Sequence, residues 1–382
     1  MALPTLYVSL HVRTAISYLI PVPSNSIALD GCLIQAGGGL HCMTGQGGDG
    51  GPKVERWRLA TFNLESLDDR LSGADDFADR MAVLRPQLQR LRADILCLQE
   101  VNAHTIDGKH GPREATGLDR LLDGTAYADY HRVISLNRGG KRPADRHNLV
   151  ILSRFPLLSH GQVWHDLVPP PAILPVTARP APDQAQAVEW DRPILWADVD
   201  LGHDRVLHVV NLHLRAPRAA WLAGQKTEHG LWLSVGGWAE GFYLAAVKRA
   251  GQALEARLVV EQMFDAQGDA LVAVCGDFNA GDREAPVRTL RGDEEDTGNG
   301  HLAARMLVPV ERSIPESQRF SVVHHGQRVM LDHILVSRPL LGCLAACEIH
   351  NETLGDELVG PATVWTAPDS FHAPMVAEFI GD

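Results

Sequence analysis

The segment that most constrains how this chain can fold is residues 271–280, which read LVAVCGDFNA. Five of the first six residues are apolar and two are β-branched, which is typical of a strand buried on both faces. Asp277 and Asn279 follow at its carboxyl end, and because side chains alternate along an extended chain, both point the same way. Gly, Asp and Asn also form ordinary turns, so this segment alone favours a turn. Similar strand ends elsewhere in the chain change that balance.

The composition indicates a folded chain without a general affinity for polyanions. With 382 residues, of which 45% are hydrophobic, it can bury one large core or two smaller ones. The formal net charge of −12 provides no overall positive field that would attract nucleic acid or anionic lipid. A charged phosphate substrate is still compatible with this charge, because a metal ion and a few local cations can supply the attraction.

Residues 1–54 differ from the rest of the chain, since they are glycine-rich and show no sustained periodicity. We expect a flexible extension there, followed by one domain at residues 55–382. No apolar run reaches the ~18 residues of a membrane span, and no secretory signal is apparent. The cysteines show no disulfide-like spacing, so we expect buried thiols in a reducing compartment. Without a secretory signal we expect the cytoplasm, and we also expect a monomer. They are Cys32, Cys42, Cys97, Cys275, Cys343 and Cys347.

Hydrophobic periodicity predicts strands mixed with two long helices. Residues 77–91 and 245–264 carry apolar side chains at helical spacing, and Pro86 predicts a kink or a second start in the first. Residues 169–191 read as a surface loop, and residues 218–241, with three tryptophans, as a packing insert or a loop on the substrate side. The predicted strands are residues 58–63, 94–101, 130–135, 148–153, 194–200, 205–213, 271–277, 328–337 and 373–380. This order favours a mixed-sheet α/β domain.

Five strand segments end in, or contain, a polar group of the kind used in catalysis, and a sixth begins just after another. Each has an ordinary explanation, but buried charge is costly unless it is paired or bound to a metal. Carboxylates and amides without cysteine suit a hard cation such as Mg²⁺ or Mn²⁺. Two histidines beside them suit proton transfer and phosphate contact. The residues are Asn63, Glu100, His213, Asp277, Asn279, Asp332 (in the middle of its strand) and His372.

Seven short segments, in order, resemble the endonuclease/exonuclease/phosphatase superfamily, which includes pancreatic deoxyribonuclease. Each segment is a weak signal alone, but their shared order is specific. They are ATFNLE, LCLQEV, NLVILSRFPL, VVNLHLRAP, VCGDFNA, LDHILVS and the final HAP before a strand, covering residue 57 to the C-terminus. The resemblance implies an α/β (α+β), deoxyribonuclease I-like fold. In that fold two mixed β-sheets, flanked by helices, form a four-layer sandwich with the site at one edge.

The resemblance also implies which residues hold a metal ion. Glu100 matches the principal metal carboxylate, Asn63 matches the Asn beside it, and Glu65 stands where some members have another acid near the metal. The family usually has an acid immediately before the last histidine, where this chain has Phe371. The nearest acid is Asp369, and a shift of two residues preserves side-chain facing, so Asp369 is included as a candidate ligand.

The remaining matches concern catalysis. Asp277 and Asn279 match the pair that orients or activates the attacking water, and His213 matches a histidine that binds a phosphate oxygen. Asp332 matches the acid that hydrogen-bonds the essential histidine, and His372 matches that histidine. Either Asp277 or the His372–Asp332 pair takes the proton of the attacking water.

These matches predict a phosphoesterase that uses Mg²⁺ or Mn²⁺ and an activated water. The substrate stays open between a phosphodiester of DNA or RNA and a small phosphodiester or phosphomonoester. A basic loop at residues 136–147 either grips a nucleic-acid backbone or a multiply phosphorylated head group, or is simply solvated. The alternative is a non-catalytic binding module on the same fold, with a metal site degraded at Phe371.

Overall fold

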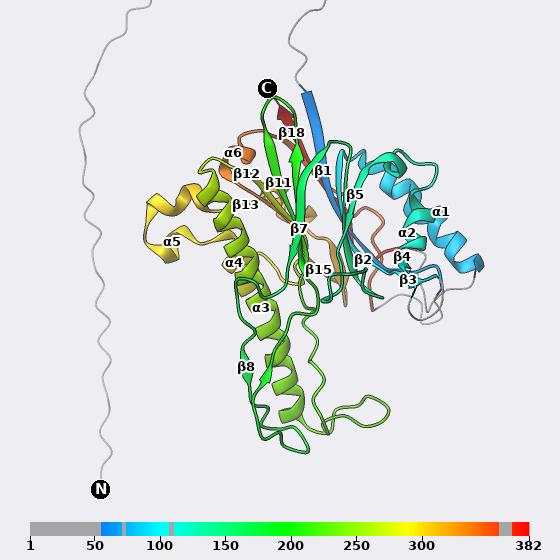
Figure 1. The fold of residues 1–382 in the computed structure, drawn as a ribbon, viewed down its shortest axis with the longest axis vertical. Coiled ribbons are helices and arrows are strands. Elements are labelled where there is room, and N and C mark those ends of the chain that lie inside the picture. The colour runs from blue at the N-terminus through cyan, green and yellow to red at the C-terminus, as the bar shows by residue number, and fades with distance from the viewer. Residues whose placement is uncertain (1–54, 71–73, 107–110, 359–368, 382) are drawn as a thin grey trace, which may run out of the picture. The chain divides into compact units, whose positions relative to one another are not determined.

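A computed structural model describes residues 55–70, 74–106, 111–358 and 369–381 of the chain (Figure 1). The flexible extension predicted for residues 1–54 lies outside these described residues, as do Cys32 and Cys42. The four cysteines within them, Cys97, Cys275, Cys343 and Cys347, are free thiols. Among the helices described, none is both long enough and apolar enough to cross a membrane.

The first of two large sheets has six strands in the order β17-β18-β1-β2-β6-β5. Its central pair, β1 and β2, is parallel, and its other pairs are antiparallel. The sheet is therefore mixed, as predicted. Its strands are β1 (Glu55–Leu67), β2 (Ile95–Val101), β5 (His131–Ile134), β6 (Asn148–Ser153), β17 (Leu344–Ile349) and β18 (Met375–Gly381).

The second sheet has the same plan, in the order β13-β16-β12-β11-β10-β7. Here β11 and β12 form the parallel pair, and the other pairs are antiparallel. The segment with which the sequence analysis began is β12, at the centre of this sheet. The strands are β7 (Leu157–Val163), β10 (Ile194–Asp200), β11 (Val206–His213), β12 (Leu271–Asp277), β13 (Val308–Pro309) and β16 (Asp332–Val336).

The two sheets pack face to face, and helices cover both outer faces (Figure 1). Side chains such as Leu59, Cys97 and Ile334 fill the space between the sheets. The helices α1 (Ala74–Leu91) and α2 (Thr116–Leu122) cover the first sheet, and α3 (Val235–Ala266) and α4 (Ala285–Arg291) cover the second. These four layers confirm the predicted sandwich.

Shorter elements complete the described chain. Three two-stranded ribbons lie outside the main sheets. They pair β3 (His104–Thr105) with β4 (Arg113–Glu114), β8 (Ala172–Ile173) with β9 (Gln186–Ala187), and β14 (Val322–His324) with β15 (Gln327–Val329). There are also two helices of four residues, α5 (Glu294–Thr297) and α6 (Arg338–Leu341). Short 3-10 turns are found at Ala126–Asp129, Gly300–Arg305, Val310–Ser313 and Glu316–Gln318.

Several predicted elements differ from the structure. The helix with Pro86 is one helix, so the second start predicted there is wrong; proline removes a single backbone donor, and the packed apolar stripe continues past it. Residues 328–337 form parts of β15 and β16 rather than one strand, so Asp332 begins a strand instead of standing in its middle. Residues 169–191 are not simply a surface loop, because they contain β8 and β9 and the fully buried Trp190.

The largest difference is a projecting lobe, which we define as residues 170–190 and 218–248. The helix α3 begins at Val235, ten residues before the predicted start, and its first half extends beyond the sandwich with β8 alongside (Figure 1). The lobe has a small core of its own, in which Val188, Leu222 and Leu244 are buried. Residues 218–241 are therefore partly helical and partly a loop packed on that helix.

Candidate active site

The sheet topology brings the predicted site residues to one edge of the sandwich. The parallel pairs β1–β2 and β11–β12 place the ends of four strands at the same edge, with Asn63, Glu100, His213 and Asp277 on them. Because β16 and β18 run antiparallel to β12 and β1, their first residues lie at that edge as well. Asp277 is directly opposite His213 on one side and Asp332 on the other.

The carboxylate of Glu100 is held by donors from β1 and lies close to β11. The amide nitrogen of Asn63 lies 3.4 Å from Oε1, and Ser66 donates to Oε2 from its backbone nitrogen at 2.9 Å and its hydroxyl at 3.1 Å. His213 Nε2 lies 3.6 Å from Oε1. Burial alone would raise the pKa of Glu100, but the positive charges of His147 and other neighbours outweigh it and lower the pKa. Glu100 is thus a carboxylate at neutral pH.

Asp277 is buried and receives donors from three strands or their flanks. Oδ2 accepts from the amide nitrogens of Asn63 at 3.1 Å and Asn279 at 3.0 Å, and Oδ1 accepts from the backbone nitrogen of Asn279 at 2.8 Å. His213 Nε2 lies 3.3 Å from Oδ2. Burial is the main reason that the pKa of Asp277 is raised to about 7. The predicted pairing of Asp277 with Asn279 is therefore present in the structure.

Gly276 allows this strand to lie close to β11. Its φ is +136°, and a Cβ added there would lie 1.9 Å from the backbone oxygen of Leu212. That oxygen belongs to the neighbouring strand and cannot move aside, so only glycine fits at this position. The glycine thereby fixes the register that sets His213 opposite Asp277.

His372 and Asp332 form a second pair beside Asp277. His372 Nδ1 lies 2.8 Å from Asp332 Oδ2. Burial opposes the charged form of His372, yet the carboxylates of Asp332 and Asp277 raise the pKa of His372 to about 10. The other oxygen, Asp332 Oδ1, is buried and has no hydrogen-bond partner among the described residues. Ligand-type atoms of Asp277, Asp332 and His372 all lie within 4.8 Å of one another.

Glu65 contacts the backbone of Phe371, the residue that stands where the family usually has an acid. Its Oε2 accepts the backbone N–H of Phe371 at 2.8 Å, and burial raises the pKa of Glu65. Asp369 instead accepts from Gln87 of α1 at 2.8 Å. Within the described residues, the hydrogen bonds of Asp369 do not reach Glu100, so its role as a metal ligand stays a prediction.

The sequence analysis missed two residues that complete this edge, His147 and Arg192. Arg192 donates to His147 Nδ1 at 3.0 Å and to the backbone oxygen of His213 at 3.2 Å, and His147 Nε2 lies 3.9 Å from Glu100 Oε2. His147 stands immediately before β6, and Arg192 stands two residues before β10. Both residues stand before a buried strand and not at its end, so the signal that located the other site residues did not mark them.

The donor set fits a hard divalent cation. The set consists of carboxylate and amide groups without a thiol, which suits such an ion. Burial is the main cause of the raised pKa of Glu65, and repulsion from the carboxylate of Glu100 adds to it. A cation there would offset this repulsion. Asn63 presents its nitrogen to Glu100 and Asp277, while its oxygen accepts the Glu65 N–H at 2.9 Å. In this arrangement Asn63 bridges two carboxylates, and its role as a ligand stays a prediction.

A buried pair behind the site predicts how stability depends on pH. His333 Nδ1 lies 2.6 Å from Glu311 Oε1, and Nε2 lies 2.8 Å from the backbone oxygen of Ala280. Burial lowers the pKa of His333, but the Glu311 carboxylate and these hydrogen bonds outweigh it and raise the pKa. The stabilisation is therefore complete below the unfolded value of about 6.5 and is lost as the pH rises through the folded pKa.

We expect urea unfolding from pH 6 to pH 9 to show a steeper loss of unfolding free energy for the wild type than for Glu311→Gln. The substitution removes the charge that raises the pKa of His333. Glu316→Gln, in an exposed 3-10 turn, is the matched control and should follow the wild type. Equal slopes for the wild type and Glu311→Gln would show that His333 is not charged in the folded chain.

Comparison with known proteins gives one family and several distant structures. The sequence profile of the Endonuclease/Exonuclease/phosphatase family matches residues 60–351. No individual curated protein matches the sequence. Truncated TDP2 from Caenorhabditis elegans is 15% identical, with a TM-score of 0.49 over 85% of this chain and 98% of that chain. An AP endonuclease from Archaeoglobus fulgidus is 16% identical, with a TM-score of 0.45 over 85% and 99%. The 3′ phosphatase NExo from Neisseria, bound to a product DNA hairpin, is 19% identical, with a TM-score of 0.46 over 85% and 99%.

Proposed function

Because this chain belongs to the endonuclease/exonuclease/phosphatase family, we propose that it is a metal-dependent phosphoesterase that hydrolyses a phosphodiester or phosphomonoester with an activated water. The observation that carries the proposal is the meeting of Glu100, His213 and Asp277 with the His372–Asp332 pair at one edge. A strand edge that only ended in turns would not bury three carboxylates and two histidines together.

Glu100 and Glu65, with Asn63 beside them, would hold one Mg²⁺ or Mn²⁺ ion. When bound, such an ion polarises a phosphoryl oxygen and offsets the charge that develops on it. Arg192 and His147 flank Glu100 and fix its side of the site. Hydrolysis also needs a proton acceptor and groups that contact the phosphoryl oxygens, and this chain has both.

We assign proton transfer from the attacking water to Asp277. Its carboxylate is oriented by Asn63 and Asn279, so that it can accept a proton without moving. His372 is oriented by Asp332 through Nδ1, which leaves Nε2 to contact the phosphoryl group. His213 and Asn279 stabilise the charge that develops there. These roles are consistent with the family resemblance and await the tests below.

The proposal is tested by metal-dependent turnover. We expect the full-length protein to hydrolyse bis(p-nitrophenyl) phosphate, or one of a panel of DNA, abasic DNA, RNA and inositol phosphates, with Mg²⁺ or Mn²⁺ and not with chelator. Glu100→Gln should lower kcat/KM by about 10²-fold or more, because it removes one ligand charge. The activity is measured by release of nitrophenol or phosphate.

The outcomes separate the proposal from its alternative. Turnover of any substrate supports the enzyme, and the substrate cleaved identifies the class. Binding of a phosphorylated ligand without turnover under either metal would instead indicate the non-catalytic module, with Phe371 in place of an acid. Glu311→Gln, behind the site, is a control variant that keeps all the proposed ligands. The cytoplasmic location and the monomeric state also stay predictions, which fractionation and light scattering can check.

A further inference from the structure

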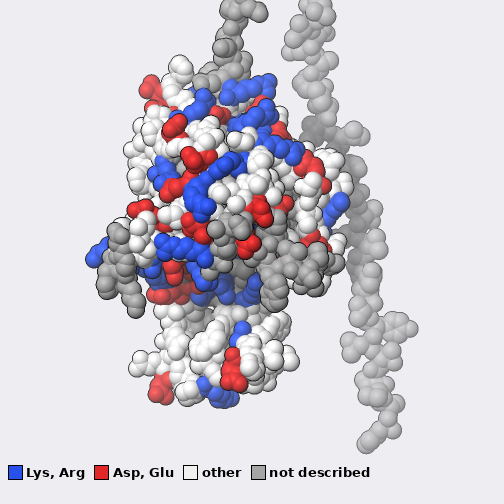
Figure 2. All heavy atoms as spheres, turned by 90° about the vertical axis from the view of Figure 1, so that its right-hand side faces the viewer, with Lys and Arg blue, Asp and Glu red and all other residues white. Residues whose placement is uncertain are grey.

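The lobe carries most of the exposed apolar surface of the described chain. Fourteen large hydrophobic side chains are exposed on the described chain, and nine of them belong to the lobe. The six most exposed of them are Val176, Trp221, Leu231, Leu233, Val235 and Tyr243, with exposed fractions of 56% to 80%. Figure 2 shows the lobe as largely uncharged below a body dense in charged side chains. Such a concentration of apolar side chains marks a surface that contacts something other than water.

The base of the lobe is joined directly to the catalytic edge. Asp191 pairs with Lys248 at 2.7 Å and with Arg215, two residues beyond His213, at 3.3 Å. The next residue after Lys248, Arg249, donates to the backbone oxygen of Asn279 at 3.3 Å. The base of the lobe is therefore tied to the segments that follow His213 and Asp277.

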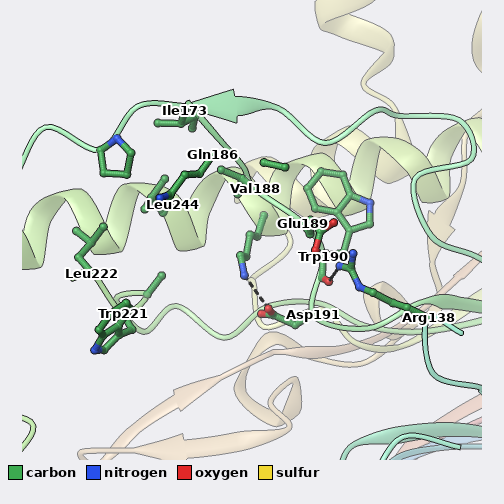
Figure 3. Close-up of a pocket in the computed structure, with 14 residues that line it drawn as sticks. Arg138, Ile173, Gln186, Val188, Glu189, Trp190, Asp191, Trp221, Leu222 and Leu244 are labelled. Atoms are coloured by element: carbon green, nitrogen blue, oxygen red, sulfur yellow. Dashed lines mark hydrogen bonds and ion pairs between the residues drawn. The ribbon is translucent and has the colours of Figure 1, made fainter. Parts of the chain in front are cut away.

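A pocket of about 470 Å³ lies at this base and has two chemically different ends (Figure 3). One end is apolar and includes Leu222 and Leu244, and the exposed Trp221 lies at its rim. The other end is charged, with Lys248 on Asp191 and Arg138 2.6 Å from Glu189. The pocket thus runs from the apolar surface of the lobe toward the charged edge.

The cations are distributed to match an interface. Within the lobe they are already engaged, since Arg179 donates to the backbone oxygen of Ala178 and Lys226 lies over the Trp232 ring. At the base, Arg138 belongs to the basic loop 136–147. In the same loop Lys141 and Arg146 are exposed and form no ion pair with the residues described. An apolar projection whose base contacts a loop with exposed cations complements a lipid surface, where acyl chains lie below a layer of phosphates.

We propose that the lobe docks on a phospholipid surface and presents an amphiphilic phosphate ester to the catalytic edge. The lobe inserts its exposed aliphatic and aromatic side chains among the lipids, and the loop cations contact the phosphate layer. The pocket at the base receives the apolar part of the ester next to the cleaved bond. The docking half of this inference stands on the lobe alone, whereas the substrate half rests on the proposed function.

Nucleic acid fits this surface less well. A nucleic-acid surface needs cations that follow the phosphate backbone. The four cations of the lobe are engaged instead, namely Arg179 with carbonyl oxygens, Lys226 with the Trp232 ring, Arg218 with Glu357 and Lys248 with Asp191. The exposed side chains at the tip, Leu231, Leu233 and Val235, are aliphatic, so they offer neither a hydrogen bond nor a ring for stacking a base. Tryptophan and tyrosine beside them are typical of side chains at a lipid interface.

The test is flotation of the full-length protein with phosphatidylcholine vesicles in a density gradient. We expect the wild type to float. In the variant with Leu233→Ser and Val235→Ser, the partition coefficient between vesicles and water should fall at least about tenfold, because two apolar side chains that would enter the lipid are lost. The matched control carries Leu158→Ser and Leu302→Ser, which are exposed leucines of the body, and should float as the wild type does. Trp221→Ser provides a second lobe variant, and thermal unfolding checks that each variant is folded.

Each outcome decides one question. A wild type that does not float, or a control that loses flotation equally, contradicts the docking surface. Two other results would also contradict it. One is a wild-type dimer in light scattering that the lobe variant converts to a monomer. The other is that the lobe variant loses binding to oligothymidine while its binding to vesicles is unchanged. Glu100→Gln should float like the wild type, because docking does not need catalysis. If the protein floats but cleaves no ester, the docking surface is supported and the proposed function is refuted. If it cleaves soluble esters without floating, the proposed function is supported and the docking surface is refuted.

Discussion

Asp277→Asn should lower kcat for metal-dependent ester hydrolysis by about 10²- to 10⁴-fold, the range lost when a general base is removed. Asparagine keeps the size of the side chain and its place between Asn63 and Asn279, but it cannot accept a proton from water. The fold should survive, because the substitution removes one of three neighbouring acidic groups that burial makes costly. The thermal midpoint is therefore expected to stay the same or rise while turnover falls.

The matched control for this substitution is Asp265→Asn. Asp265 is near the end of α3 and pairs with Arg305 at the surface, so its loss should leave kcat within a factor of two. Steady-state kinetics at saturating Mg²⁺ or Mn²⁺ measures both variants, and calorimetry measures their midpoints. If Asp277→Asn keeps kcat within tenfold of the wild type, Asp277 is not the proton acceptor, and the His372–Asp332 pair becomes the candidate.

The parts of the fold that could be predicted from the sequence are those with a one-dimensional signal. The strand β12 is an apolar run that stops at a carboxylate, and β1, β2 and β11 follow the same rule. Motif order then indicated the family, which the match over residues 60–351 confirms, and the family implied the four layers. The site residues could be named because a polar side chain at the end of a buried run is conspicuous along the chain.

The lobe could not be predicted in the same way. Residues at the start of α3 alternate between its small core and solvent, so that Leu244 is buried while Phe242 and Tyr243 are exposed. No single apolar stripe results, and the helical period is lost in the sequence. The break at Met330 and Leu331, which separates β15 from β16, has no glycine or proline to mark it.

The departures in the site have a different origin, since they depend on contacts between distant segments. His147 and Arg192 contact each other across 45 positions of the chain, and neither stands in a motif whose chemistry is evident. The absent acid at Phe371 shows the same limitation. The residue type at position 371 predicts a degraded site, whereas the hydrogen bond from the Phe371 N–H to Glu65 is visible only in the fold. Glu65 could be named from the sequence as an acid near the metal, but its contact with Phe371 could not.

Glu255→Ala should lower the free energy of unfolding by about 3–5 kcal/mol, the largest loss of stability expected for any variant considered. Glu255 is fully buried on α3, and its carboxylate accepts the Trp190 indole N–H at 2.5 Å. It also accepts three backbone N–H groups, from His165 at 3.1 Å, Leu167 at 3.0 Å and Val168 at 3.3 Å. Alanine would leave the buried indole N–H and the three part-buried backbone N–H groups without this acceptor.

Two further variants identify the cause of that loss. Glu255→Gln keeps the volume and one acceptor oxygen, so it should recover part of the lost free energy. Glu261→Ala, on the same helix, removes a partly exposed carboxylate that pairs with Arg305, and should cost about 1 kcal/mol or less. Urea unfolding measures all three.

Because Glu255 positions Trp190 at the wall of the pocket, Glu255→Ala should also weaken vesicle flotation. A loss below about 1 kcal/mol for Glu255→Ala would mean that water reaches these donors and that the base of the lobe is not sealed.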